Sequence, residues 1–212
     1  MKCLIVTAGA QPEKELLFEH LRDAGFTVCV DGAADTLVKY SAVPDVLVGD
    51  FDSADSDSVS QLEAAGARLV RLPVHKNETD TEAAVNLALE SGADDIVILG
   101  ALGLRLDHAL GNLAMLIKAE RAGAHCRIID EVHELTAARD EYELNGIPGQ
   151  TVSILPIAGD ITVTATNLMY PLENLLLRSD AARGISNIFL KSPARLTING
   201  GWALIVKISE KA

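Results

Sequence analysis

Two carboxylates stand two residues apart at the end of an apolar run, in residues 44–53 (PDVLVGDFDS). Residues i and i+2 of an extended chain point to the same face, so Asp50 and Asp52 can reach one ion while Phe51 turns away. Mg²⁺ favours oxygen ligands and typically takes one or two carboxylates plus the phosphates of a substrate. The pair therefore indicates the metal anchor of a nucleotide-using enzyme, or else an acidic, solvated loop, because further aspartates follow closely.

Three more aspartates follow other apolar runs. Asp31 ends one such run, and Asp80 and Asp107 stand where helical patterns begin. Each of them, taken singly, is typical of a helix N-cap or first turn. Taken together with the acidic pair, they would repel one another at one sheet edge unless cations lay among them. The joint pattern therefore favours a Mg²⁺ site.

Basic residues and glycines occur in the same segments. Lys76 is a point charge suited to phosphate, and Arg105 is a planar fork suited to it. Gly100 and Gly103 allow a backbone to approach a ligand closely. The spacing matches neither a Walker loop nor GxGxxG. The alternatives are a surface position for Lys76 and a simple ion pair between Arg105 and Asp107.

The elements that position these residues alternate along the first part of the chain. Short apolar strands are predicted at 2–7, 27–30, 46–48, 68–72, 96–99 and 126–129, with helices after Pro12 and at 32–40, 59–65, 79–90 and 107–122. This alternation predicts an α/β domain with a mostly parallel sheet flanked by helices. Ligands of such sheets bind outside the carboxyl ends of the strands, where the aspartates fall.

The pattern changes after residue 130 to short strands punctuated by Gly, Pro, Asn and Asp, with turns expected at 140–141 and 145–146. It predicts an all-β, sandwich-like C-terminal domain. We place an α/β nucleotide-binding catalytic domain at 1–132 and the all-β domain at 133–212. Trp202 is expected either to pack beside a strand or to stack on a cationic ring.

Composition narrows the classes of partner and compartment. With 18 Lys and Arg against 30 Asp and Glu, the net charge of −12 disfavours nucleic acid and anionic membranes as partners. The three cysteines are scattered and form no CxxC pair, which indicates free thiols in a reducing compartment. We expect no signal peptide and no membrane span, and hence a cytoplasmic location.

Several segments together resemble thiamine pyrophosphokinase (thiamine diphosphokinase). They are 31–35 (DGAAD), 44–53 (PDVLVGDFDS), 76–82 (KNETDTE), 100–112 (GALGLRLDHALGN), 167–174 (NLMYPLEN) and 184–187 (GISN). The resemblance implies transfer of the diphosphate group of ATP to the hydroxyl of thiamine, giving thiamine diphosphate and AMP. It also implies a homodimer that binds thiamine through its C-terminal domain. Asn77 and Asn167 depart from the family pattern, which often has Asp and Gly there.

The resemblance also assigns roles to residues of this chain. Mg²⁺ binding falls to Asp50, Asp52 and Asp80, and catalysis to these three with Arg105 and Asp107. Binding of ATP or thiamine falls to Asp31, Lys76, Thr79, Arg105, Asp107, Ser186 and Asn187. Asp107 or Asp31 would orient the thiamine hydroxyl or take its proton, and the sequence does not choose between them.

Two other functions remain open from the sequence. Asp50-Phe51-Asp52 is also a DxD motif, the metal motif of many glycosyltransferases that use sugar nucleotides. A non-catalytic nucleotide sensor would bind ATP and Mg²⁺ without thiamine-dependent turnover.

Overall fold

The computed structural model describes residues 1–73, 77–103 and 105–209, and divides the chain into two compact units, Met1–Glu131 and Val132–Ala212. The N-terminal unit contains β1 (Lys2–Val6), α1 (Lys14–Asp23), β2 (Phe26–Val30), α2 (Ala33–Lys39), β3 (Val46–Gly49), α3 (Ser56–Ala64), β4 (Arg68–Arg71), α4 (Asp80–Glu90), β5 (Asp95–Leu99), α5 (Leu106–Arg121) and β6 (His125–Ile129). No helix among the described residues is long and apolar enough to cross a membrane.

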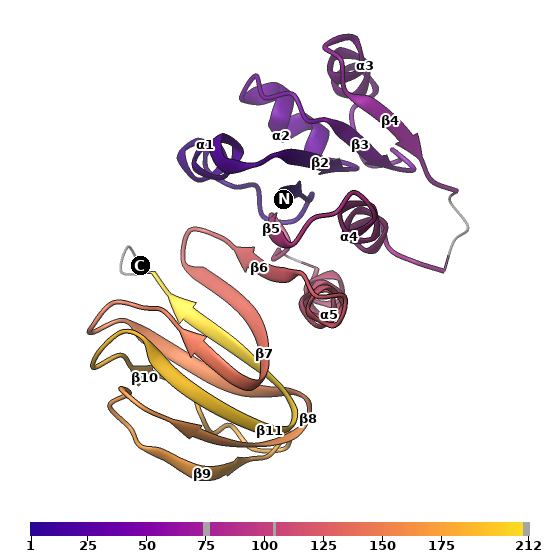
Figure 1. The fold of residues 1–212 in the computed structure, drawn as a ribbon. Helices are drawn as coiled ribbons and strands as arrows, with labels where there is room; N and C mark the ends of the chain where they lie inside the picture. Colours follow the sequence, from indigo (N-terminus) through magenta and orange to yellow (C-terminus); the bar gives the residue numbers. More distant parts are fainter. Residues whose placement is uncertain (74–76, 104, 210–212) are drawn as a thin grey trace. The chain divides into compact units, whose positions relative to one another are not determined.

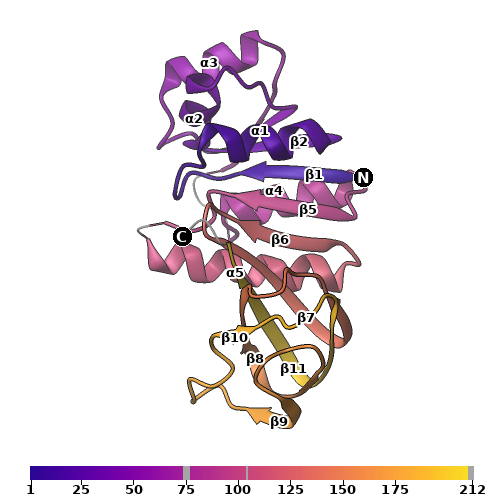
Figure 2. The ribbon, with the colours of Figure 1, turned by 90° about the vertical axis from the view of Figure 1, so that its left-hand side faces the viewer.

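The sheet of the N-terminal unit is parallel, with strand order β6-β5-β1-β2-β3-β4. Figure 2 shows β2, β1, β5 and β6 side by side. The chain moves outward from β1 to β4 and then returns to β5 on the other side of β1. This reversal creates a topological switch point between β1 and β5, where doubly wound sheets bind ligands.

The same reversal places helices on both faces of the sheet, because crossovers between parallel strands are right-handed. Helices α1, α2 and α3 cover one face, and α4 and α5 cover the other (Figure 1). Leu17, Leu37 and Leu62, one from each helix of the first group, share a core with Leu4 and Leu47 of the sheet. The helix predicted at 59–65 begins earlier, at Ser56, because the Asp55 carboxylate caps it by accepting from the backbone N–H of Asp57 (2.9 Å).

The C-terminal unit is antiparallel and consists of β7 (His133–Leu144), β8 (Thr151–Ala165), β9 (Leu172–Leu177), β10 (Asn187–Ile188) and β11 (Ala194–Ile208). β11 lies between β7 and β8, and β8 also pairs with β9 and β10. The fold class predicted from the sequence, a parallel α/β part followed by an all-β part, is confirmed.

β7, β8 and β11 are longer than the short strands predicted, and the turn expected at residues 140–141 is wrong. β7 continues through Asp140, which takes a left-handed φ of 57°. The register of β11 against β7 shifts between Ile198, opposite Asp140, and Ala203, opposite Ala138, so the irregularity lies in β11 and β7 runs on through the expected turn. Asn167, which replaces a glycine of the family pattern, takes φ 63°, a conformation that Asn tolerates.

The three cysteines, Cys3, Cys29 and Cys126, are buried, and none of them forms a disulfide. Burial, followed by the charge of Asp45, raises the pKa of the Cys3 thiol to about 12. Thiols of this kind are packing residues and not nucleophiles, because the thiolate is the reactive form.

Candidate functional site

A pocket of about 640 Å³ opens at the switch point of the N-terminal unit. Residues 7–9 after β1, residues 100, 101 and 103 after β5, and the first turns of α4 and α5 line it, together with Asp31 and Ser53. Its volume falls within the range of ligand sites in proteins. Two helix N-termini at one pocket provide backbone N–H groups and positive dipole ends, which favour an anionic ligand such as a phosphate.

The wall between β1 and β5 consists of two loops packed backbone to backbone. The N–H of Gly9 donates to the carbonyl of Gly100 (2.9 Å), and the N–H of Ala10 donates to that of Leu102 (2.5 Å). A Cβ added to Gly9 would lie 2.7 Å from the Leu102 oxygen and closer still to that of Gly100. Only glycine fits at this contact, so the residue type sets the shape of the pocket wall.

The acids from β2 and β3 converge, as the sequence predicts. Carboxylate oxygens of Asp31, Asp50 and Asp52 lie within 4.8 Å of one another. The charge of Asp50, followed by desolvation and the charges of Asp31 and Asp80, raises the pKa of Asp52. Asp80, the first residue of α4, therefore acts on the same cluster. Crowded carboxylates of this kind favour a bound cation.

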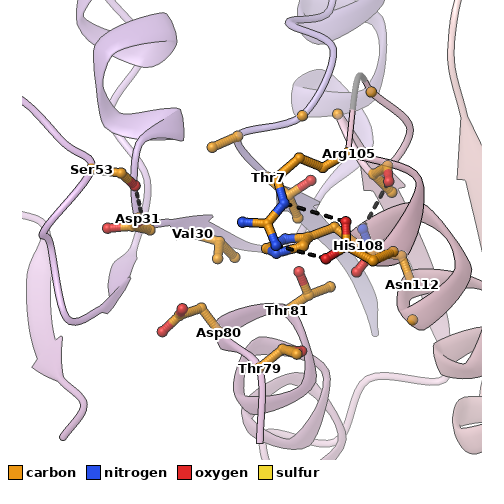
Figure 3. Close-up of a pocket in the computed structure, with 17 residues that line it drawn as sticks. Thr7, Val30, Asp31, Ser53, Thr79, Asp80, Thr81, Arg105, His108 and Asn112 are labelled. Atoms are coloured by element: carbon orange, nitrogen blue, oxygen red, sulfur yellow. Dashed lines mark hydrogen bonds and ion pairs between the residues drawn. The ribbon is translucent and has the colours of Figure 1, made fainter. Parts of the chain in front are cut away.

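Asp31 presents one carboxylate oxygen that has no partner. Its Oδ2 accepts a hydrogen bond from the hydroxyl of Ser53 (Figure 3). Its Oδ1 is buried, and no group in the described part of the chain donates to it. Asp31 also takes a left-handed φ of 47°, held by its own N–H to the Val48 carbonyl (2.9 Å). A buried oxygen without a donor is costly, and a cation or ligand proton would satisfy it.

Figure 3 places Arg105 and His108 across the pocket from Asp31 and Asp80. Arg105 forms a bidentate ion pair with Asp107, with Nη2–Oδ2 at 2.6 Å and Nε–Oδ1 at 3.3 Å. This hydrogen bonding lowers the pKa of Asp107 to about 2 and raises the pKa of Arg105. Both side chains are more than half exposed, so the pair can rearrange toward a ligand.

None of the three aspartates that resembled helix caps occupies a cap position. Thr79 caps α4, its hydroxyl accepting from the N–H of Glu82 (3.1 Å), and Asp80 follows as the first helical residue. The residues flanking α5 and α2 at their starts are Arg105 and Gly32. Asp80 and Asp107 do lie in the first turns of α4 and α5, the other position expected of them, where a negative charge suits the helix dipole.

The remaining predicted site residues lie in other parts of the chain. Ser186, in the C-terminal unit, takes φ 58°, and its N–H donates to the hydroxyl of Ser153 (3.0 Å). The buried amide of Asn187 bonds to the backbone N–H (3.0 Å) and carbonyl (2.8 Å) of Tyr170. Their contacts with a ligand stay a prediction. Lys76 lies outside the described residues.

Trp202 packs within the C-terminal unit, which is one of the two roles expected for it. It is 7% exposed on β11, and the guanidinium of Arg139 lies 5.3 Å from the centre of its ring.

Sequence reasoning missed several residues of the pocket. Thr7 and Gly9 follow β1 directly, and the strand-exit argument used for the aspartates would have found them. Ser53 ends the acidic segment, but its partner lies 22 residues away. Asn112 is buried on α5 and donates to the carbonyl of Ala101 (2.8 Å), which fixes the loop after β5.

A doubly wound sheet with clustered carboxylates, an arginine and two helix N-termini at its switch point is typical of α/β enzymes that act on phosphorylated ligands. The family model "Thiamin pyrophosphokinase, catalytic domain" matches residues 18–128. The model "Thiamin pyrophosphokinase, vitamin B1 binding domain" matches residues 132–201. The chain belongs to the thiamine pyrophosphokinase family.

Characterised relatives agree with this assignment. The chain is 29% identical to thiamine pyrophosphokinase of Bacillus subtilis over 184 residues, covering 85% of this chain and 86% of that protein. The crystal structure of thiamine pyrophosphokinase from B. subtilis superposes with a TM-score of 0.86 at 26% identity, covering 99% of this chain and 100% of that one. That of Geobacillus thermodenitrificans gives a TM-score of 0.85 at 29% identity, covering 100% and 99%.

Proposed function

We propose that this chain is an ATP:thiamine diphosphotransferase, which transfers the diphosphate group of ATP to the hydroxyl of thiamine and releases AMP. The observation that carries the proposal is the convergence of Asp31, Asp50 and Asp52 in a unit that also presents Arg105 and two helix N-termini to one pocket. Family membership favours this function over the sugar-nucleotide transferase and the nucleotide sensor that the sequence left open.

The acid cluster fits a divalent cation, which we propose to be Mg²⁺. The unpartnered oxygen of Asp31 and the raised pKa of Asp52 both describe carboxylates that lack a counter-charge. Asp50 and Asp52 would hold the ion together with Asp31, while Asp80, which lies outside the group of carboxylate oxygens within 4.8 Å, would act on it through its charge. When bound, Mg²⁺ would neutralise charge on the ATP phosphates.

Side chains and helix N-termini would accelerate the transfer by positioning the phosphates and by offsetting their charge. Thr79 and the first turn of α4 would hold phosphate oxygens through backbone N–H groups. Arg105 would bind the transferring phosphates through the N–H groups that its pair with Asp107 leaves open, because a guanidinium has five donors and the pair uses Nε and Nη2. Lys76 would supply a further positive charge.

The lowered pKa of Asp107 bears on which group accepts the proton of the thiamine hydroxyl. A carboxylate with a pKa of about 2 is a weak base at neutral pH, so Asp107 in its pair with Arg105 is poorly matched to that role. We therefore assign Asp107 to holding Arg105, and Asp31 to orienting the thiamine hydroxyl.

We assign ATP to the domain at residues 1–132 and thiamine to the domain at 133–212, where Ser186 and Asn187 lie. The name of the second matching family model, a vitamin B1 binding domain, supports this division. We further propose a homodimer, to be tested by light scattering. The three cysteine thiols fit the reducing cytoplasm.

The test is incubation of the protein with ATP, Mg²⁺ and thiamine, followed by mass analysis and nucleotide chromatography. The proposal predicts thiamine diphosphate and AMP in equal amounts. ADP as the nucleotide product would contradict the reaction. Binding of ATP without thiamine-dependent turnover would support a sensor, and turnover of a UDP- or GDP-sugar would support a glycosyltransferase.

A further inference from the structure

Gly111 lies inside helix α5 at a position where no contact with the described residues calls for a glycine. Glycine is the poorest helix former after proline, and Gly111 lies in the middle of α5. Of the 16 glycines, the others either take a left-handed φ or have a protein atom within 4 Å of where a Cβ would lie. Gly111 has neither: its φ is helical, and no atom of the described residues, beyond its own helix turn, comes within 4 Å.

The empty space beside Gly111 is the pocket. Gly111 is one of the lining residues, and so is His108, one helical turn earlier on the same face of α5. Its neighbour Asn112 is buried and bonded to the loop after β5, which fixes the rotation of the helix. A side chain at position 111 would therefore project toward the ligand and not into the protein core.

We infer that Gly111 is a specificity-determining position, whose missing side chain leaves room for the nucleoside part of ATP against the backbone of α5. This inference rests on the proposed function, in which this pocket takes ATP. The inference explains why a poor helix former stands inside α5, because the bound ligand would fill the space that a side chain would otherwise occupy.

The position of Gly111 within α5 indicates that it faces the nucleoside of ATP and not the phosphates. The phosphate-binding features are the first turns of α4 and α5, Arg105, and the acids from β2 and β3. Gly111 lies one turn beyond that end of α5, where backbone N–H groups are bonded within the helix and offer no donor to an anion. The nucleoside is the uncharged part of ATP and needs no free N–H donor, so it is the part that we place against this wall.

The experiment compares Gly111→Ala and Gly111→Leu with the wild type by calorimetric binding of ATP and of inorganic tripolyphosphate, both with Mg²⁺. Tripolyphosphate carries the phosphates without the nucleoside. Ala114→Leu is the matched control, since it adds the same side chain to an exposed position of α5 that does not line the pocket. Gly111→Ala guards against misfolding, because alanine is the better helix former.

We expect Gly111→Leu to weaken ATP binding about 10-fold or more, as overpacking against a ligand does, and to leave tripolyphosphate binding within about 2-fold. Gly111→Ala should weaken ATP binding less, while its Tm rises by roughly 1–3 °C. The Ala114→Leu control should bind both ligands as the wild type does.

Three outcomes would overturn the inference: ATP binding unchanged in Gly111→Leu, equal weakening of ATP and tripolyphosphate, or no ATP binding by the wild type. Steady-state KM values separate a failure of the inference about Gly111 from a failure of the proposed function. If the wild type converts thiamine and releases AMP while Gly111→Leu raises only the KM for thiamine, the inference fails and the proposed function stands. If the wild type binds ATP but does not convert thiamine, the proposed function fails, and the comparison of ATP with tripolyphosphate still decides the role of Gly111.

Discussion

Replacing Gly9 with alanine tests the packing that shapes the pocket wall. The added Cβ would lie 2.7 Å from the oxygen of Leu102 and nearer to that of Gly100, whereas such contacts need at least 3.0 Å. The loops after β1 and β5 would have to move apart, straining the bonds from Gly9 and Ala10 to the facing loop. Gly9 has no left-handed φ, so the clash alone carries the effect.

The expected magnitude combines two terms. Overpacking costs about 1–3 kcal/mol, and each weakened hydrogen bond costs about 1 kcal/mol. We therefore expect Gly9→Ala to lose about 2–4 kcal/mol of unfolding free energy and roughly 5–15 °C of Tm. Thermal unfolding followed by circular dichroism measures the Tm, and calorimetry measures ATP binding, which should weaken because Gly9 lines the pocket.

Gly111→Ala is the control, since it adds the same methyl group to the same pocket without meeting a described protein atom. Its Tm should stay level or rise. A Gly9→Ala protein with the wild-type Tm and wild-type ATP affinity would refute the backbone packing described for these two loops.

Three further perturbations test the charged groups. The folded protein raises the pKa of Asp52, so this carboxyl binds more protons in the folded than in the unfolded chain above pH 4 or so, and its contribution to stability in EDTA should fall as pH rises there. Asp52→Asn should remove that part of the slope in thermal unfolding, and an unchanged slope would count against the carboxylate cluster. Ser53→Ala, which frees Asp31, should weaken Mn²⁺ binding roughly 10–100-fold, while Ser53→Thr should retain it; equal affinities would show that Ser53 does not position Asp31. Arg105→Ala should return the pKa of Asp107 from about 2 toward about 3.9, as followed by NMR titration of the carboxyl carbon; a pKa that stays near 2 would mean that another group depresses it.

The parallel part of the fold could be predicted because its signals are local. β2 (FTVCV) and β3 (VLVG) are short and largely apolar, and Asp31 and Asp50 follow them directly, with Asp52 two residues later. Since parallel strands end at one edge, their proximity follows from the fold class. The convergence of these carboxylates in the structure agrees with that argument.

The features that could not be predicted depend on contacts between distant segments. The continuation of β7 through Asp140 depends on pairing with β11, more than 50 residues later, and a polar pair inside a strand resembles a turn when the partner strand is unknown. The bond from Ser53 to Asp31 joins two loops whose spacing is set only by the folded sheet. The importance of Gly9 depends on carbonyls of a loop more than 90 residues away.

Titration of the protein with Mn²⁺ at pH 7 in the presence of a non-hydrolysable ATP analogue tests the central claim most directly. The account predicts that the wild type binds the ion and that Asp52→Asn loses at least about 10-fold in affinity while its fold is retained. Asp57→Asn removes the same charge from the first turn of α3, outside the cluster, and should bind as the wild type does. Equal Mn²⁺ affinity in the wild type and Asp52→Asn would contradict the claim that these carboxylates gather around a cation.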